Sequence, residues 1–207
     1  MIPIKQLLLI CAAVALVGCG ETPTNWNWVS DPSDPNNVKV ERQIRGAIKK
    51  PTGELTKADL EKVTYLYLSI NQLTSVKCLE KLTQLTEVNL TRNQLTDVTG
   101  LENLDQLKEL DLYKNQLTDV KGLEKLTQLT WLHLGGNQLT DVKGLEKLTQ
   151  LKDLRLHDNQ LTDVKGLEKL DQLKTLSLSR NPDLTKAQID GLKKALPKCY
   201  IGSNPTK

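Results

Sequence analysis

The 207-residue sequence contains no phenylalanine, only one methionine and two histidines, and aromatic residues make up 3% of it. A compact globular core normally uses large rings to fill irregular space. Leucine, in contrast, accounts for 40 residues. A core built almost entirely from one aliphatic side chain indicates that the same small packing problem is solved repeatedly, so internal repeats are expected.

An excess of charge of one sign is also missing. The chain has 28 Lys or Arg against 25 Asp or Glu, a formal net charge of +3. This balance argues against a nucleic-acid-binding protein, which normally has a clearly basic face. The sequence has neither a glycine-rich phosphate loop nor a CxxC pair, which argues against nucleotide and thiol chemistry.

The N-terminal segment has the features of a targeting signal. One positive charge, Lys5, precedes an apolar run from Leu7 to Val17. That run is shorter than the ~20 residues that cross a bilayer, but it matches the hydrophobic part of a signal peptide. It leads into Leu16-Val17-Gly18-Cys19, which resembles the lipobox of bacterial lipoproteins.

The lipobox resemblance implies that residues 1–18 are a signal peptide and that Cys19 becomes the acylated N-terminus. It also implies a membrane-anchored lipoprotein of the bacterial cell envelope, and Gly20 after the cysteine implies the outer membrane in a Gram-negative organism. The alternative is an ordinary signal peptide whose cleavage site happens to contain Cys19.

Residues 19–37 are rich in proline, asparagine and aspartate, which disfavour a continuous helix or a central strand. We therefore expect a flexible tether. Trp26 and Trp28 interrupt this polar run. They suit either the lipid headgroup level or packing on the first folded element.

The rest of the chain repeats with a fixed period. Asparagine recurs every 22 residues from Asn71 to Asn181, and residues 115–129 are identical to residues 137–151. The apolar positions follow the leucine-rich repeat pattern L-x-x-L-x-L-x-x-N-x-L. Over residues 63–181 the sequence resembles the 22-residue class of internalin-like and SDS22-like proteins. The resemblance implies an α/β solenoid, a horseshoe or arc with a short-stranded parallel sheet on its concave face and short helical or 3-10 turns on its convex side.

Physical reasons support each fixed place of the repeat. Leu110 and Leu112 alternate around Asp111, so a short strand points both leucines to one side. Each asparagine can donate and accept hydrogen bonds at once, which satisfies buried turn groups, and we interpret it as structural. The acid four residues after the asparagine, Asp119 in one copy, can cap a short helical turn. A column of metal sites is the alternative, but it lacks the further oxygen ligands that calcium requires.

Both ends of a solenoid need caps. Residues 38–62 are predicted to form an N-terminal helical cap, because Val40 and Ile44 are spaced for one helix face and residues 56–59 fit a capping-box variant. Residues 182–207 are predicted to form a C-terminal cap whose helix begins after a capping box at residues 185–188.

Two cysteines lie in the folded part. Residues 199–201 are expected to form a last strand, with Cys199 in a core position that leucine fills elsewhere. Cys78 replaces a glycine of the other repeats. Five repeats separate the two thiols, which corresponds to ~24 Å at the usual strand spacing. We therefore predict no disulfide between them.

Variation among the repeats is concentrated at strand positions that point away from the leucines. These positions are rich in aromatic residues and arginine but poor in lysine, the composition of a protein-binding surface. Drift at unconstrained positions is the alternative, although exposed aromatic rows carry an aggregation cost. The predicted partner-binding residues of this concave face are Tyr65, Tyr67, Glu87, Asn89, Glu109, Asp111, Tyr113, Trp131, His133, Asp153, Arg155 and His157.

Among these residues we expect two roles. The aromatic anchors are Trp131, Tyr113, Tyr65 and Tyr67, and the residues that set polar register are Asp111, Arg155 and His133. The concave face carries mixed and nearly balanced charge, which suits a protein or glycan partner better than nucleic acid. We predict a monomer that binds a protein partner there and needs no cofactor.

Catalysis and metal binding are the competing interpretations. Asp111 and His133 should be neighbours, but no serine or cysteine lies beside them as a nucleophile, so we predict no enzyme activity. His133, His157 and Asp153 could form a zinc site, but their spacing follows from the repeat alone, and we predict no metal. A structural spacer or adhesin, with ordinary solvated Lys and Glu columns on the convex face, is the alternative to partner binding.

Overall fold

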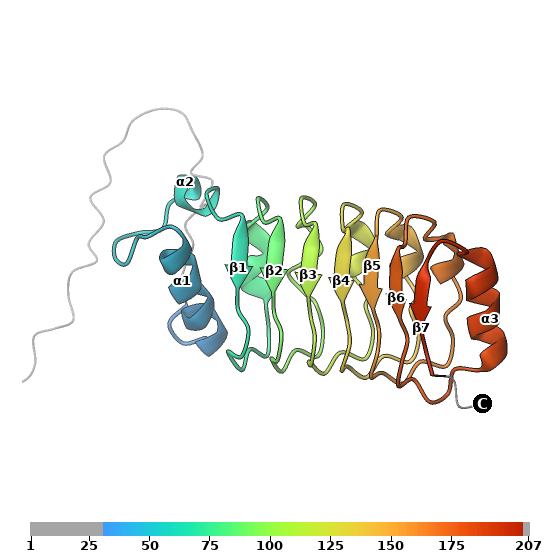
Figure 1. Ribbon diagram of the computed structural model, residues 1–207. Coiled ribbons are helices and arrows are strands. Elements are labelled where there is room, and N and C mark those ends of the chain that lie inside the picture. The colour runs from blue at the N-terminus through green and yellow to red at the C-terminus, as the bar shows by residue number, and fades with distance from the viewer. Residues whose placement is uncertain (1–30, 205–207) are drawn as a thin grey trace, which may run out of the picture.

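The computed structural model describes residues 31–204 of the chain. Successive coils each contribute one short strand to a seven-stranded parallel sheet whose spatial order follows the sequence (Figure 1). The α/β solenoid predicted from the repeat is therefore confirmed. The strands are β1 (Tyr65–Tyr67), β2 (Glu87–Asn89), β3 (Glu109–Asp111), β4 (Trp131–His133), β5 (Asp153–Arg155), β6 (Thr175–Ser177) and β7 (Tyr200–Gly202).

The register of the sheet follows the 22-residue period. Leu110 of β3 pairs with Leu132 of β4, and the same step holds from β1 to β6. The last step is longer, because Leu176 pairs with Ile201 across the inserted C-terminal helix. Equivalent residues of the repeats thus form straight columns across the sheet.

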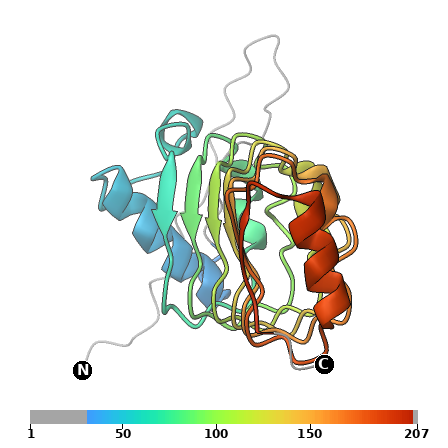
Figure 2. The ribbon, with the colours of Figure 1, turned by 45° about the vertical axis from the view of Figure 1, so that its right-hand side comes forward.

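Turns and short 3-10 helices form the side opposite the sheet (Figure 2). The 3-10 helices are η1 (Lys77–Lys81), η2 (Leu123–Lys125), η3 (Leu145–Lys147) and η4 (Leu167–Lys169). The residue before η2, Gly122, has a φ of 105°, a left-handed conformation that only glycine adopts readily.

The aspartate of the repeat does not cap the 3-10 helix, so that prediction is wrong. Asp119 Oδ1 accepts a hydrogen bond from Lys121 N in the loop before η2. Glu124 closes the turn instead, since its Oε2 accepts from Gly122 N at 2.6 Å. The same carboxylate contact recurs at Glu102, Glu146 and Glu168. The glutamate column that the sequence suggests is merely solvated therefore shapes the turn.

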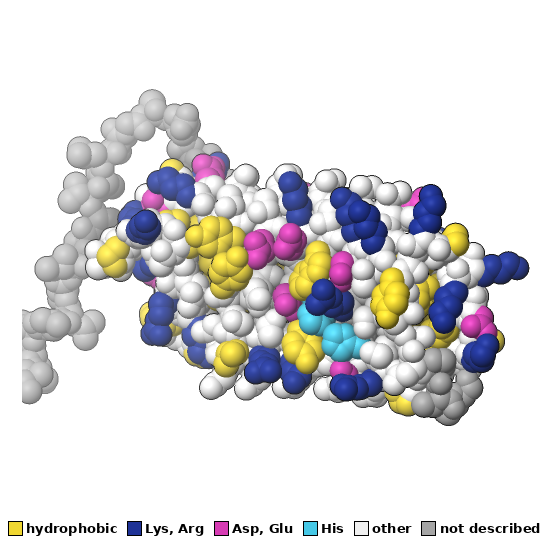
Figure 3. Space-filling model, in the orientation of Figure 1, with side chains coloured by type: hydrophobic (Ala, Val, Ile, Leu, Met, Phe, Trp, Pro, Cys, Tyr) yellow, Lys and Arg dark blue, Asp and Glu magenta, His cyan; other side chains and the backbone are white. Residues whose placement is uncertain are grey.

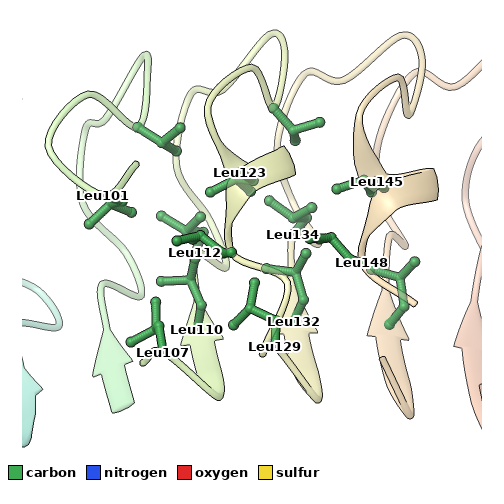
Figure 4. Packing of buried hydrophobic residues seen from close by; sticks show 14 of the residues in the cluster. Leu101, Leu107, Leu110, Leu112, Leu123, Leu129, Leu132, Leu134, Leu145 and Leu148 are labelled. Atoms are coloured by element: carbon green, nitrogen blue, oxygen red, sulfur yellow. The ribbon is translucent and has the colours of Figure 1, made fainter. Parts of the chain in front are cut away.

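Leucines fill the interior between the sheet and the turns. Leu110 and Leu112 point inward from β3, Leu123 points inward from η2, and all three are fully buried. Leucines of neighbouring coils interleave along the solenoid axis (Figure 4). Burying each such side chain contributes roughly 1.5–3 kcal/mol, so the stacked coils stabilise one another.

The repeated asparagines join neighbouring coils, as predicted. Asn115 Nδ2 donates to Leu90 O of the preceding coil and to Leu112 O of its own coil, both at 3.0 Å. Its Oδ1 accepts from Leu95 N at 3.2 Å. One buried amide thus satisfies three backbone groups where the chain leaves the sheet.

The N-terminal cap begins earlier than expected. Helix α1 spans Pro35–Ala47, so its first residues lie in the segment predicted to be tether. Asp34 accepts a hydrogen bond from Asn36 N as the N-cap, and proline at the first helical position costs no hydrogen bond. Asn36 is buried and accepts from Thr74 N at 2.9 Å, which joins the cap to the first coil.

The remaining cap elements follow the predicted signals. Helix α2 (Lys57–Leu60) begins with the capping box of Thr56 and Asp59, and helix α3 (Lys186–Ala195) begins with that of Thr185 and Gln188. In contrast, Ile201 rather than Cys199 takes the buried leucine position of the last strand.

The cysteines of the described region are both free and partly buried. Cys78 lies in η1 near the N-terminal end of the solenoid, whereas Cys199 directly precedes β7. Burial raises the pKa of the Cys78 thiol to about 12, so little thiolate forms at neutral pH.

Cys19, Trp26 and Trp28 lie outside the described residues, as does most of the predicted tether. Within residues 31–204, none of the helices combines the length and the apolar composition that crossing a membrane requires.

Candidate partner-binding face

The outward side chains of the strands form two columns in register. Tyr65, Glu87, Glu109, Trp131, Asp153 and Thr175 make one column, and Tyr67, Asn89, Asp111, His133, Arg155 and Ser177 make the other. We call these columns, with Tyr113 and His157 just beyond β3 and β5, the strand face; it is the face that the sequence predicts to be concave. All twelve predicted binding residues lie on it.

Two tyrosines mark the N-terminal end of the strand face. The rings of Tyr65 and Tyr67 lie 5.6 Å apart, and the residues are 46% and 52% exposed. The Tyr67 hydroxyl hydrogen-bonds with Glu87, and this bond together with the charge of Glu87 raises the pKa of Tyr67. Tyr67 thus stays protonated and orients that carboxylate.

Two residues of the second column also serve the backbone. Asn89 Oδ1 accepts from Thr91 N at 3.0 Å, and Asp111 Oδ1 accepts from Tyr113 N at 2.9 Å. Each closes the turn at the end of its strand. The sequence predicts partner contacts for both residues but does not indicate this local role.

A cluster of four rings occupies the centre of the strand face. Tyr113 stacks on His133 with ring centroids 4.6 Å apart, and Trp131 meets His133 edge-on at 5.7 Å. His157 completes the cluster, 5.3 Å from His133 and 5.8 Å from Tyr113. Both histidines lie together in the space-filling view (Figure 3).

His133 is the most enclosed member of this cluster. It is only 9% exposed, and its Nδ1 lies 3.4 Å from Asp111 Oδ1. Burial opposes ionisation of Asp111, but hydrogen bonds from His133 and from Tyr113 N outweigh that effect and lower its pKa. Nε2 of His133 is buried without a hydrogen-bond partner among residues 31–204.

Gly135 makes room for the cluster. A Cβ atom at this position would lie 2.8 Å from two ring atoms of His157 and 3.1 Å from His133 Nε2. The equivalent positions of neighbouring repeats carry Tyr113 and His157 themselves. The missing side chain between them leaves the space into which both rings extend, a tertiary consequence that the repeat pattern does not show.

Charged pairs occupy the C-terminal part of the strand face. Arg155 Nε lies 3.0 Å from Asp153 Oδ1, and its guanidinium carbon lies 5.3 Å from the centroid of Trp131. Arg180 pairs with Asp158 at 3.1 Å. Most of these charges are therefore balanced within the chain.

Tyr200 is a member of this face that sequence analysis misses. It pairs with Thr175 and extends the first column onto β7, with 74% of the residue exposed. The signal was its alternation with Cys199 and Ile201, but the longer last step concealed the register.

The competing interpretations can be compared with this geometry. Beside the Asp111–His133 pair, the positions open to a nucleophile hold Tyr113 and Gly135. Across residues 31–204, no group of three or more His, Cys, Asp and Glu side chains is arranged to hold a metal ion. The arrangement offers rings and paired charges, which are groups that bind by contact.

Comparison with known proteins places the repeat. The model of tandem leucine-rich repeats, described as "Leucine Rich repeats (2 copies)", matches residues 61–103, 105–147, 127–168 and 149–194. A comparison with curated protein sequences finds no match.

Solved structures similar to this one include two Listeria monocytogenes internalins. InlF is 31% identical with a TM-score of 0.65, over 72% of this chain and 45% of InlF. InlC2 is 26% identical with a TM-score of 0.64, over 84% of this chain and 89% of InlC2. A leucine-rich-repeat protein of Leptospira interrogans is 33% identical with a TM-score of 0.65, over 69% of this chain and 38% of that protein. The chain thus spans less than half the length of two of these relatives.

Proposed function

We propose that this chain, which belongs to the leucine-rich repeat family, is a lipid-anchored binding protein of the bacterial cell envelope that recognises a protein partner through its strand face. Leucine-rich-repeat proteins of the internalin type are generally protein-interaction modules. The chain acts as a monomer in this proposal, and the partner contacts the rings and charges described above.

The observation that carries the proposal is the contrast between the two sides of the solenoid. The return segments hardly change from repeat to repeat, whereas four of the seven aromatic residues gather on the strand face. Tyr65 and Tyr67 are about half exposed there, at a cost in solubility that a binding role would explain. Aromatic residues and arginine in a row are typical of energetically dominant contacts between proteins.

Anchoring is a separate part of the proposal and rests on the lipobox-like sequence before Cys19. Several acyl chains hold a protein on a membrane stably, whereas one chain is marginal. Metabolic labelling with an alkyne fatty acid should mark the wild-type chain and leave Cys19→Ser unlabelled. Equal labelling of both would contradict acylation at this residue.

Partner recognition is tested by photo-cross-linking in the native envelope. A photoreactive amino acid in place of Asp153 samples the strand face, and one in place of Lys121 samples the opposite side. We expect one protein to be joined through position 153 only, and to be lost when Tyr113→Ala and Trp131→Ala are combined. Thermal unfolding of that double variant checks that the solenoid remains intact.

Adducts that form equally from both positions, or that survive the double variant, would contradict recognition by the strand face. A structural spacer without a specific ligand there would then be the better description.

A further inference from the structure

We propose that β1–β4 carry a subsite for a cationic side chain of the partner protein, an arginine or a lysine, which binds Glu87 and Glu109 between Tyr65 and Trp131. This inference rests on the proposed function and deepens it, because it names the chemistry that the partner presents. The four residues are consecutive members of one column of the sheet.

The two glutamates form a pair of like charges. Glu87 and Glu109 occupy registered positions on neighbouring strands, about 4.8 Å apart. Like charges in directly opposed positions of a sheet destabilise it. Neither carboxylate forms an ion pair with a lysine or arginine of residues 31–204. A cation from outside these residues would relieve the repulsion.

Acids elsewhere on the strand face are treated differently. Asp153 is paired with Arg155, and Asp158 is paired with Arg180. Asp111 has His133 at 3.4 Å. The unneutralised negative charge is therefore confined to the stretch between Tyr65 and Trp131, where the space-filling view shows acidic side chains between hydrophobic ones (Figure 3).

Aromatic rings border the glutamates on both sides. Tyr65 is 46% exposed on the β1 side, and Trp131 is partly exposed on the β4 side. Trp131 already attracts one guanidinium, that of Arg155 on β5, whereas Glu109 lies on its other side on β3. Rings of this kind attract cations and pack against the apolar stems of arginine and lysine.

The dimensions of the subsite suit a single long side chain. Three strand spacings separate the backbones of Tyr65 and Trp131, about 14 Å in total. A planar guanidinium can reach both carboxylates and stack on a ring, which favours arginine. Tyr67 fixes one of the two acceptors, because its hydroxyl hydrogen-bonds with Glu87.

The test uses Trp131 as its reporter. The chain has three tryptophans, so Trp26→Phe with Trp28→Phe in the full chain, held in a non-ionic detergent, leaves Trp131 alone. The probes are the blocked peptide acetyl-Gly-Arg-Arg-Gly-amide and the same peptide with citrulline, which keeps the shape but loses the charge. We expect a saturable change of Trp131 emission with the arginine peptide and at least tenfold weaker binding of the citrulline peptide.

Variants assign the binding to the two glutamates. Combining Glu87→Gln with Glu109→Gln should weaken the arginine peptide at least tenfold. The control combines Asp105→Asn with Asp171→Asn, which removes the same charge at exposed turn positions where other repeats carry threonine. This control should bind within twofold of the parent chain.

Three results would overturn the subsite: equal binding of the two peptides, unchanged binding by the glutamine variant, or displacement of the peptide by millimolar calcium chloride, which would make it an inorganic-cation site. The proposed function fails separately. A cross-linked partner whose yield is unaffected by the glutamine variant would contradict the subsite alone, whereas peptide binding without any partner on the strand face would contradict the proposed function.

Discussion

His133 Nδ1 lies 3.4 Å from Asp111 Oδ1 across the β3–β4 pair, while Nε2 of the same ring is buried without a hydrogen-bond partner among the described residues. One edge of the imidazole is thus satisfied and the other is not. The Tyr113 ring stacks on His133, so the side chain serves largely as an aromatic plate. Four predictions follow from this cluster and from the repeat that supports it.

Replacing His133 by phenylalanine should keep the stacked ring and remove the unsatisfied nitrogen. Because a buried polar group without a partner costs about 1–3 kcal/mol, we expect the free energy of unfolding to rise by about 1 kcal/mol in urea denaturation. His133→Ala leaves a cavity and should lower it by about 2–4 kcal/mol. Equal losses in both variants would show that Nε2 makes a stabilising contact.

The stability of the protein should depend on the protonation of His157. Burial lowers the pKa of His157 below its usual 6.5, the charge of neighbouring His133 lowers it further, and Asp158 acts in the opposite direction. The folded state therefore binds fewer protons than the unfolded chain, so the contribution of His157 is complete above pH 6.5 and is lost as the pH falls through the lowered value.

Nuclear magnetic resonance titration of the imidazole should place the His157 midpoint below 6.5. Urea denaturation between pH 7.5 and 5 should show a smaller pH dependence for His157→Gln than for the wild type. A midpoint at or above 6.5 would contradict the burial of this ring in the cluster.

The repeated asparagines should differ in importance along the solenoid. Asn115→Ala leaves Leu95 N and the carbonyls of Leu90 and Leu112 without their buried partner, so we expect a loss of about 3 kcal/mol. Asn71→Ala is the matched control, because this first copy is only partly buried and its amide donates to Ser69 O alone. It should cost less than half as much. Similar losses at both positions would indicate that burial does not set the effect.

Gly135→Ala should disturb the ring cluster, because the new Cβ would meet His157 at 2.8 Å. Overpacking of this kind costs about 1–3 kcal/mol. Gly191→Ala is the control: a Cβ there has open space, and alanine in helix α3 should stabilise by about 0.5–1 kcal/mol. Adding His157→Ser to Gly135→Ala should restore much of the loss, and an absence of rescue would place the strain elsewhere.

The sequence by itself determined the coils, their stacking and the side on which each residue lies. The period of 22 residues places Leu110 beside Leu132 and Glu87 beside Glu109 without knowledge of any distant contact. This works because a solenoid makes tertiary contacts only between neighbouring repeats, so local spacing sets both the strand and its register. The asparagine ladder and the two capping boxes were predictable for the same reason.

Only the tertiary structure decided what breaks the period. Helix α1 begins at Pro35 because Asn36 bonds to the first coil, and Ile201 aligns with Leu176 because α3 lengthens the last step. Tyr113 and His157 close over Gly135 because side chains from adjacent coils share the space that one missing Cβ leaves. Such arrangements depend on side-chain volume and direction across coils, which a one-dimensional pattern does not carry.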